Sequence, residues 1–200
     1  MLSPDPITRI EAALSKVGHS SSDFDLNPDV VLPEGRVLKP AAVLVAFQRQ
    51  DDELRLFLTK RASHLKHHPG QIAFPGGKLD EGDDSLEAAA LREAWEEIGL
   101  PRGNTRLLGR LPSHETVTSY LVTPIVAEIT QPFEQVPEAG EVAEVFTVPV
   151  SHILNSAHYV VERRRWRGVW RSFYTVPYGP YYIWGATARI LRSLADAAER

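Results

Sequence analysis

Three glutamates in the middle of the chain have a spacing that could support metal chemistry. On a helix, Glu93, Glu96 and Glu97 would share one face, because residues three and four positions apart are neighbours. Carboxylates gathered on one face repel one another unless a cation lies among them. Mg²⁺ takes oxygen ligands and commonly combines one or two carboxylates with substrate phosphates. The spacing therefore predicts a magnesium site for phosphate chemistry.

The residues around these glutamates predict the helix that must position them. Its apolar residues are expected to face the opposite way and pack into a core: Ala88, Leu91, Trp95 and Ile98. Asp84 stands three residues before Glu87, which predicts a capping box at the start of the helix. Gly99 and Pro101 are typical of its end.

Two glycines precede this helix across a short acidic loop. Gly76 and Gly77 would let the backbone approach a metal ion and a diphosphate closely. The acidic residues that follow are expected to form a solvated loop with one helix cap: Asp80, Glu81, Asp83 and Asp84. Arg92 lies among carboxylates, so we expect it to orient a glutamate through a charge-assisted hydrogen bond.

The stretch from Gly77 to Leu100 resembles the Nudix box, in which a glycine and a glutamate precede the pattern Arg-Glu-aliphatic-x-Glu-Glu-x-Gly-aliphatic. The matching residues are Gly77, Arg92, Glu93, Glu96, Glu97, Gly99 and Leu100. The spacer from Gly77 to Arg92 is one residue longer than the common pattern, and its acidic residue is Asp83 or Asp84. Ala94 replaces a larger aliphatic residue.

The longer spacer is similar to that of the coenzyme A pyrophosphatase branch of the Nudix family. Residues 56–77 (LFLTKRASHLKHHPGQIAFPGG) also resemble the upstream signature of this branch. Phe57 stands where leucine is usual, and Lys66 stands where arginine is usual. Lysine cannot form the two-pronged hydrogen bond of arginine, so a phosphate contact there would be looser. Near the C-terminus, residues 183–191 (IWGATARIL) are similar to the family's closing helix.

The resemblance implies metal-dependent hydrolysis of the diphosphate bond of coenzyme A or its thioesters, giving 3′,5′-ADP and 4′-phosphopantetheine. Mg²⁺ or Mn²⁺ would bind Glu93, Glu96 and Glu97, and the carbonyl of Gly76 would be a further ligand. A diphosphate conjugate such as ADP-ribose is the enzymatic alternative, because the box alone does not separate these substrates. A catalytically silent nucleotide-binding module is a third reading, although such domains usually lose the box glutamates.

Further roles follow from the resemblance and from nearby charge. A box glutamate is the expected general base, with a later glutamate in reserve, so the expected catalytic residues are Glu93, Glu96, Glu97, Arg92, Glu141 and Glu144. The expected substrate-binding residues are Arg61, Lys66, His67, Phe74, Gly76 and Gly77. The basic patch formed by Arg61, Lys66 and the neighbouring histidines either contacts phosphate or is a plain surface loop.

Two other clusters have competing interpretations. Zinc binding by His64, His67 and His68 is disfavoured, because no second ligand cluster accompanies them. Five arginines alternate with aromatic residues between positions 163 and 174, and this pattern predicts either RNA binding or a twisted hairpin with solvated arginines. The alternation around a turn favours the hairpin. The arginines are Arg163, Arg164, Arg165, Arg167 and Arg171, and the aromatic residues are Trp166, Trp170, Phe173 and Tyr174.

Composition bounds the class of protein. Two hundred residues, 43% of them hydrophobic, predict a folded domain with a substantial core. A net charge of −4 gives no general attraction to nucleic acid. The sequence has no cysteine, no evident signal peptide and no apolar run long enough to span a membrane. A cytoplasmic enzyme with a small-molecule substrate is expected, and a homodimer is left open.

The order of expected elements predicts an α/β (α+β) fold with a mixed β-sheet between helices. The Nudix resemblance implies an α/β/α sandwich. Strands are expected at 41–47, 54–61, 106–112, 120–129 and 142–148, followed by a hairpin over 158–176. Helices are expected at 5–17, with Ile7, Ile10, Leu14 and Val17 on one side, and at 185–197. Residues 1–36 are expected to form an N-terminal helix and linker, and residues 37–200 the Nudix hydrolase domain.

Overall fold

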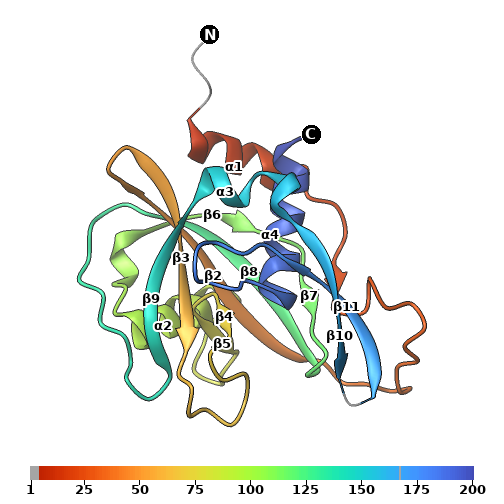
Figure 1. Cartoon of the computed structure of the whole chain (residues 1–200). Helices are drawn as coiled ribbons and strands as arrows, with labels where there is room; N and C mark the ends of the chain where they lie inside the picture. Colours follow the sequence, from red (N-terminus) through yellow and green to blue (C-terminus); the bar gives the residue numbers. More distant parts are fainter. Residues whose placement is uncertain (1–4, 167) are drawn as a thin grey trace.

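The computed structural model describes residues 5–166 and 168–200. Residues 1–4 and Arg167 lie outside the described residues, as does the side chain of Trp166. A nine-stranded mixed sheet lies between helix α2 (Leu86–Ile98) on one face and helices α1 (Pro6–Leu14) and α4 (Gly185–Ala198) on the other (Figure 1). Two separate clusters of buried side chains fill the two interfaces. The expected α/β/α sandwich with a mixed sheet is confirmed.

The central strand β2 (Lys39–Gln50) shows why the sheet is buried on both faces. Leu44 and Ala46 point into the cluster beneath α2, whereas Val45 and Phe47 point into the cluster beneath α4. Successive side chains of a strand alternate between faces, so a continuous apolar run places both sets in a core. The buried strand expected over 41–47 is confirmed.

The neighbours of β2 complete the sheet. β2 pairs parallel with β8 (Tyr120–Ile129) and antiparallel with β3 (Glu53–Arg61). The β2–β3 turn consists of Asp51 and Asp52, whose φ values of 46° and 65° suit the right-handed twist of a two-residue hairpin. The remaining strands are β1 (Ser21–Ser22), β4 (Ile72–Ala73), β5 (Gly76–Lys78), β6 (Thr105–Arg110), β7 (His114–Glu115) and β9 (Val142–Pro149). The strands expected at 54–61, 106–112, 120–129 and 142–148 are therefore present, while β1, β4, β5 and β7 are too short to show a hydrophobic period.

The N-terminal segment packs onto the same sandwich. Helix α1 is shorter than the expected 5–17, and its residues Ile7, Ile10 and Ala13 are buried in the cluster beneath α4. Farther along, Asn27 bonds to both the backbone N–H and the carbonyl of Ser172, at 2.8 and 2.9 Å. Three short helices complete the fold: η1 (Arg102–Asn104), α3 (Val150–Ile153) and η2 (Ser156–His158). No helix in the described ranges has both the length and the apolar character needed to cross a membrane.

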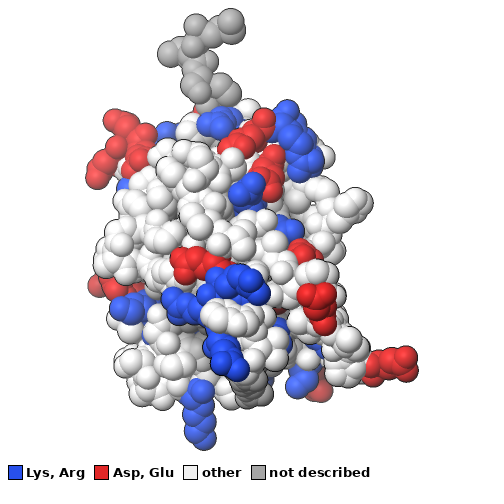
Figure 2. Space-filling model, turned by 45° about the vertical axis from the view of Figure 1, so that its right-hand side comes forward, with Lys and Arg blue, Asp and Glu red and all other residues white. Residues whose placement is uncertain are grey.

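A separate two-stranded sheet lies beside α4. It consists of β10 (Val160–Trp166) and β11 (Val169–Thr175), as the hairpin expected over 158–176 requires. Basic side chains gather on the face of the molecule that this hairpin occupies (Figure 2).

Helix α2 is oriented differently from the sequence expectation. Trp95, placed in the core by its apolar character, is 54% exposed, and Ala88 and Leu91 are only partly buried. The buried residues are Ala89, Ala90, Ala94, Ile98 and, unexpectedly, Glu97. Small alanines allow the helix to lie close to the sheet, so the helix is rotated toward its alanine face. This rotation brings Glu97 against β5.

Candidate active site

The backbone of β5 and the last turns of α2 meet at Glu97. The N–H of Gly76 donates a hydrogen bond of 3.3 Å to Oε2 of Glu97, whose residue is only 6% exposed. A Cβ at Gly76 would lie 2.4 Å from the carbonyl oxygen of Ala42 on β2. Glycine is therefore required at this position, because strands β5 and β2 approach too closely for any side chain.

Gly77 lies directly against the carboxylate of Glu93 on α2. A Cβ at Gly77 would lie 2.2 Å from Oε1 of Glu93. Gly77 thus leaves room for the carboxylate of Glu93, while the N–H of Gly76 binds the carboxylate of Glu97. The absence of a side chain at Gly76 and Gly77 therefore lets the backbone approach β2 and Glu93 closely.

Burial and mutual repulsion make these carboxyl groups hard to ionise in the absence of a cation. Burial, followed by the nearby carboxylate of Glu93, raises the pKa of Glu97 to about 8. Burial also raises the pKa of Glu93 above its ordinary value, although the neighbouring Arg92 opposes the change. The charge of Glu141 contributes to the rise at both groups.

Arg92 connects the acidic loop to the glutamates. Its Nε and Nη2 donate to the two carboxylate oxygens of Asp83, at 3.0 and 2.9 Å. Its Nη1 donates to Oε1 of Glu93 at 3.0 Å and to Oε2 of Glu96 at 2.9 Å. The guanidinium is therefore fixed on one side by Asp83 and orients glutamates on the other side.

The acidic loop is solvated as expected at Asp80, Glu81 and Asp84, and Asp83 is the exception. The side chain of Asp83 is only 4% exposed, and its hydrogen bond with Arg92 holds the pKa of Asp83 below its ordinary value. The helix cap is Ser85, whose side chain accepts the N–H of Ala88, and not the expected box at Asp84. The sequence could not predict the ion pair of Asp83 with Arg92, because the conformation of an irregular loop does not follow from residue spacing.

Glu96 is placed apart from the other two glutamates. Its side chain is 53% exposed and bonds to Arg92, whereas the side chain of Glu93 is 17% exposed. In residues 5–166 and 168–200, no group of three or more histidine or acidic side chains has a geometry that would hold a metal ion. Glu93 and Glu97 nevertheless form a buried carboxylate pair whose repulsion a cation would relieve. This donor set fits Mg²⁺, which commonly uses one or two carboxylates together with phosphate oxygens.

Arg61, at the end of β3, lies near this pair. Its positive charge lowers the pKa of Glu97, opposing the effect of burial. Its Nε atom is buried and has no hydrogen-bond partner in the described part of the chain. A buried donor without a partner is costly, and a guanidinium in this state is suited to an anionic ligand.

The other expected substrate-binding residues occupy two environments. Lys66 and His67 are exposed in the loop between β3 and β4. His64, in the same loop, contacts the carbonyl oxygen of Gly140 through Nε2 at 3.1 Å, which brings the loop beside Glu141. Phe74 is only 4% exposed and belongs to the core cluster beneath α4, so it can act on a ligand only by fixing the Phe74–Gly77 backbone.

The two reserve glutamates lie on different faces of the sheet. Glu141 is exposed and acts electrostatically on Glu93 and Glu97. Glu144 accepts a hydrogen bond from Oη of Tyr181, whose ring stacks on Phe146 in the cluster beneath α4. Glu141 is therefore the reserve residue that the structure brings to the α2 carboxylates.

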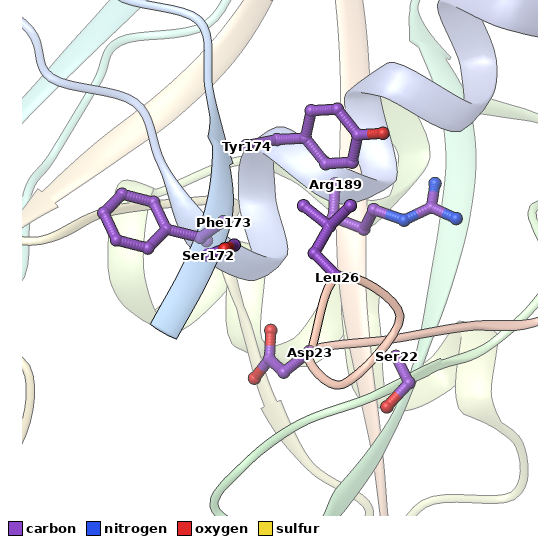
Figure 3. A pocket seen from close by; sticks show the side chains of 8 residues that line it. Ser22, Asp23, Leu26, Ser172, Phe173, Tyr174 and Arg189 are labelled. Carbon is purple, nitrogen blue, oxygen red and sulfur yellow. The ribbon is translucent and has the colours of Figure 1, made fainter. Parts of the chain in front are cut away.

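A hollow of about 370 Å³ adjoins Arg92 and Glu96 beside the 80–84 loop, and this size is typical of ligand sites. A second hollow lies between the 22–26 turn, β11 and the start of α4 (Figure 3). Its volume of about 20 Å³ has room for about one water molecule, so it is too small for a substrate.

The family model for the NUDIX domain matches residues 38–170. The chain therefore belongs to the Nudix family, in agreement with its α/β/α sandwich and its helix of clustered glutamates. The chain is a Nudix hydrolase, and hydrolases of this family generally use divalent cations such as Mg²⁺ or Mn²⁺.

Relatives and a solved structure agree with this assignment. An "Uncharacterized Nudix hydrolase NudL" of Enterobacter sp. (strain 638) is 40% identical over 186 residues, which cover 86% of this chain and 94% of that protein. A protein of the same description from Salmonella heidelberg (strain SL476) is 40% identical over 181 residues, covering 88% and 92%. The crystal structure of a MutT/nudix family protein from Enterococcus faecalis has a TM-score of 0.53 at 16% identity, covering 84% of this chain and 64% of that one. This last similarity concerns the fold alone.

Proposed function

We propose that this Nudix hydrolase cleaves the diphosphate bond of coenzyme A or its thioesters, giving 3′,5′-ADP and (acyl-)4′-phosphopantetheine. The observation that carries the proposal is the position of Arg61 beside the buried pair of Glu93 and Glu97. Arg61 belongs to the upstream stretch that resembles the coenzyme A pyrophosphatase signature, and the glutamates belong to the box. The fold brings both stretches to one surface.

The charges at this surface suit a diphosphate. Glu93 and Glu97 offer oxygen ligands, and the Nε of Arg61 is a buried donor with no partner among the described residues. A phosphate oxygen would satisfy that donor, and charge-assisted hydrogen bonds of this kind are about twice as strong as neutral ones. Lys66 and His67 lie exposed in the adjoining loop, where they would meet the more distant phosphate of coenzyme A.

A divalent cation is proposed to bind Glu93 and Glu97 together with the carbonyl of Gly76, and Glu96 would join them on turning away from Arg92. Mg²⁺ or Mn²⁺ at these residues would neutralise phosphate charge and lower the pKa of water. Arg92 would hold Glu93 in its orientation through the hydrogen bond that the structure shows. A glutamate of the box would accept the proton of the attacking water, and Glu141 is the reserve residue.

Product analysis tests this proposal. The protein with Mg²⁺ or Mn²⁺ is incubated with coenzyme A, acetyl-coenzyme A, ADP-ribose, NADH and a diadenosine polyphosphate, and the products are identified by mass spectrometry. We expect 3′,5′-ADP together with phosphopantetheine from coenzyme A, at a higher kcat/KM than for the other compounds. A higher kcat/KM for ADP-ribose would overturn the coenzyme A assignment while leaving the Nudix chemistry intact.

A further inference from the structure

Three aromatic rings form a partly exposed cluster where the hairpin meets the start of α4. Phe173 of β11 lies 5.2 Å from Trp184, and Tyr182 lies 6.5 Å from Trp184, as measured between ring centroids. We refer to Phe173, Tyr182 and Trp184 as the aromatic cluster. All three residues are only partly buried, so ring surface remains accessible to a ligand.

Arg164 of β10 covers this cluster. Its guanidinium carbon lies 5.0 Å from the ring centroid of Tyr182 and 6.0 Å from that of Phe173. A guanidinium stacked on ring faces keeps its N–H donors in the plane of the group, where they can bind phosphate. The cluster therefore combines ring faces with a cation, which is the combination that binds a nucleobase and its phosphate.

The cluster is held in a defined orientation. Oη of Tyr182 donates a hydrogen bond of 2.8 Å to Oε2 of Glu162, which stands two residues before Arg164 on the same face of β10. Because this contact fixes the Tyr182 ring beneath Arg164, less conformational entropy is lost when a ligand stacks there.

Charge on the hairpin favours an anion. Arg164 stands directly opposite Arg171 in the strand register, and like charges in this position destabilise a sheet. Figure 2 shows basic side chains gathered on this face of an otherwise acidic protein.

A short chain of contacts joins the cluster to the candidate active site. Gly185, which follows Trp184, lies against Gln71, because a Cβ at Gly185 would be 3.9 Å from Nε2 of Gln71. The carbonyl of Gln71 accepts the N–H of Arg61 at 2.9 Å. The loop between β3 and β4 thus begins after Arg61 and ends beside Gly185, the residue that follows Trp184 of the aromatic cluster.

From this arrangement we propose that Arg164, Phe173, Tyr182 and Trp184 bind the nucleobase end of the diphosphate substrate. The inference rests on the proposed function for its substrate, since a nucleobase must be part of the molecule that is cleaved. The base stacks on the aromatic cluster, and Arg164 contacts the 5′-phosphate that joins the sugar to the diphosphate, so the 3′-phosphate of coenzyme A is left to Lys66. These residues determine specificity for a nucleotide and take no part in the chemical step.

Binding of two uncleavable probes tests the inference on the full chain with Mg²⁺. The probes are α,β-methylene-ADP, which has a base, and methylenediphosphonate, which has none, and both are measured by isothermal titration calorimetry. Trp184→Leu and Arg164→Ala are expected to weaken the nucleotide probe by at least about fivefold, the lower end of the loss on removing a stacked ring. Trp184→Leu should leave methylenediphosphonate unchanged, and Trp184→Phe should retain nucleotide affinity because it keeps a ring.

Arg163→Ala is the matched control. Arg163 lies over the ring of Trp170, 5.7 Å from its centroid, on the opposite face of the same hairpin. This variant should bind both probes like the wild type, and thermal unfolding should show that all variants are folded. Unchanged nucleotide affinity in both Arg164→Ala and a folded Trp184→Leu would overturn the inference.

The two proposals can fail separately. If coenzyme A is not cleaved but Arg164→Ala and Trp184→Leu still weaken the nucleotide probe, the nucleobase site stands and the coenzyme A assignment fails. If coenzyme A is cleaved while the variants bind the nucleotide probe like the wild type, the nucleobase site fails alone.

Discussion

The N–H of Gly76 and Oε2 of Glu97 are joined by a hydrogen bond of 3.3 Å that ties strand β5 to helix α2. Gly76 has a φ of 155°, and a Cβ there would lie 2.4 Å from the carbonyl oxygen of Ala42. Both facts exclude other residues at this position. Strand β5 is therefore packed directly against β2, and this packing fixes the position of the N–H that binds Glu97.

Gly77→Ala should reduce activity while leaving the protein folded. The added methyl carbon would lie 2.2 Å from Oε1 of Glu93, so the carboxylate must move away from β5. Displacing a ligand by about 1 Å can cost on the order of a hundredfold in rate. The kcat should fall by about this factor. Gly103→Ala, where the methyl meets nothing within 4 Å, is the control, and equal activities in the two variants would contradict the expected role of Gly77.

Removal of the metal or of one metal-site charge should abolish most activity. EDTA should stop hydrolysis, and added Mg²⁺ or Mn²⁺ should restore it. Glu97→Gln should lower kcat by at least about a hundredfold, because it removes a charge from the proposed metal site. Steady-state kinetics and isothermal titration with Mn²⁺ measure both effects. A Glu97→Gln variant with wild-type kcat and Mn²⁺ affinity would disprove the assignment.

In EDTA, the stability of the folded protein should decrease as the pH rises from about 4.5 to about 8. The folded state holds the proton of Glu97 more tightly than the unfolded state, because the pKa is raised from 4.5 to about 8. Stability from this group is therefore complete below pH 4.5 and lost as the pH rises to 8. The difference in unfolding free energy between wild type and Glu97→Gln should change by on the order of 4 kcal/mol over this range.

Urea unfolding at several pH values measures this difference, and taking it between two variants cancels the other titrating groups. Saturating Mg²⁺ should remove the pH dependence, since metal binding favours the ionised carboxylate. A difference that stays constant with pH in EDTA would show that folding does not raise the pKa of Glu97.

Asp83→Asn should weaken the site through Arg92. The substitution removes the charge that the guanidinium contacts through two hydrogen bonds, and one charge-assisted hydrogen bond contributes about 1.5–3 kcal/mol. Thermal unfolding should show lower stability, and kcat should fall because Arg92 no longer holds Glu93. Asp84→Asn changes the exposed neighbour and should alter neither quantity. Equal behaviour of the two variants would mean that Asp83 does not position Arg92.

Lys66→Ala should raise the KM for coenzyme A more than that for dephospho-coenzyme A. Lys66 is exposed in the loop that follows Arg61, where it would contact the 3′-phosphate that only coenzyme A has. The expected loss is that of one charge-assisted hydrogen bond, about 1.5–3 kcal/mol in kcat/KM. Lys16→Ala, a change outside this loop, is the control. Identical kinetics on the two substrates before and after the mutation would show that Lys66 does not bind the 3′-phosphate.

Local patterns were enough to predict a mixed sheet between helices and its main strands, and the Nudix resemblance implied the sandwich. The run from Ala41 to Phe47 had to be buried on both faces, because every residue in it is apolar. The polar residues Gln50, Asp51 and Asp52 between two apolar runs predict a turn, and Asp51 and Asp52 have the positive φ values that such a turn needs. The helix bearing Glu93, Glu96 and Glu97 followed from a spacing that places side chains on one face.

Contacts between distant segments were decided only by the tertiary structure. The sequence placed Trp95 in the core and left Glu97 outside, but close packing of Ala90 and Ala94 on the sheet rotated the helix and buried Glu97. The pairing of Asp83 with Arg92, and the separation of Glu141 from Glu144, also depend on neighbours far along the chain. Residue spacing shows which side chains share a face of a helix or strand. Which face meets which neighbour is set by the shapes that pack with the fewest voids.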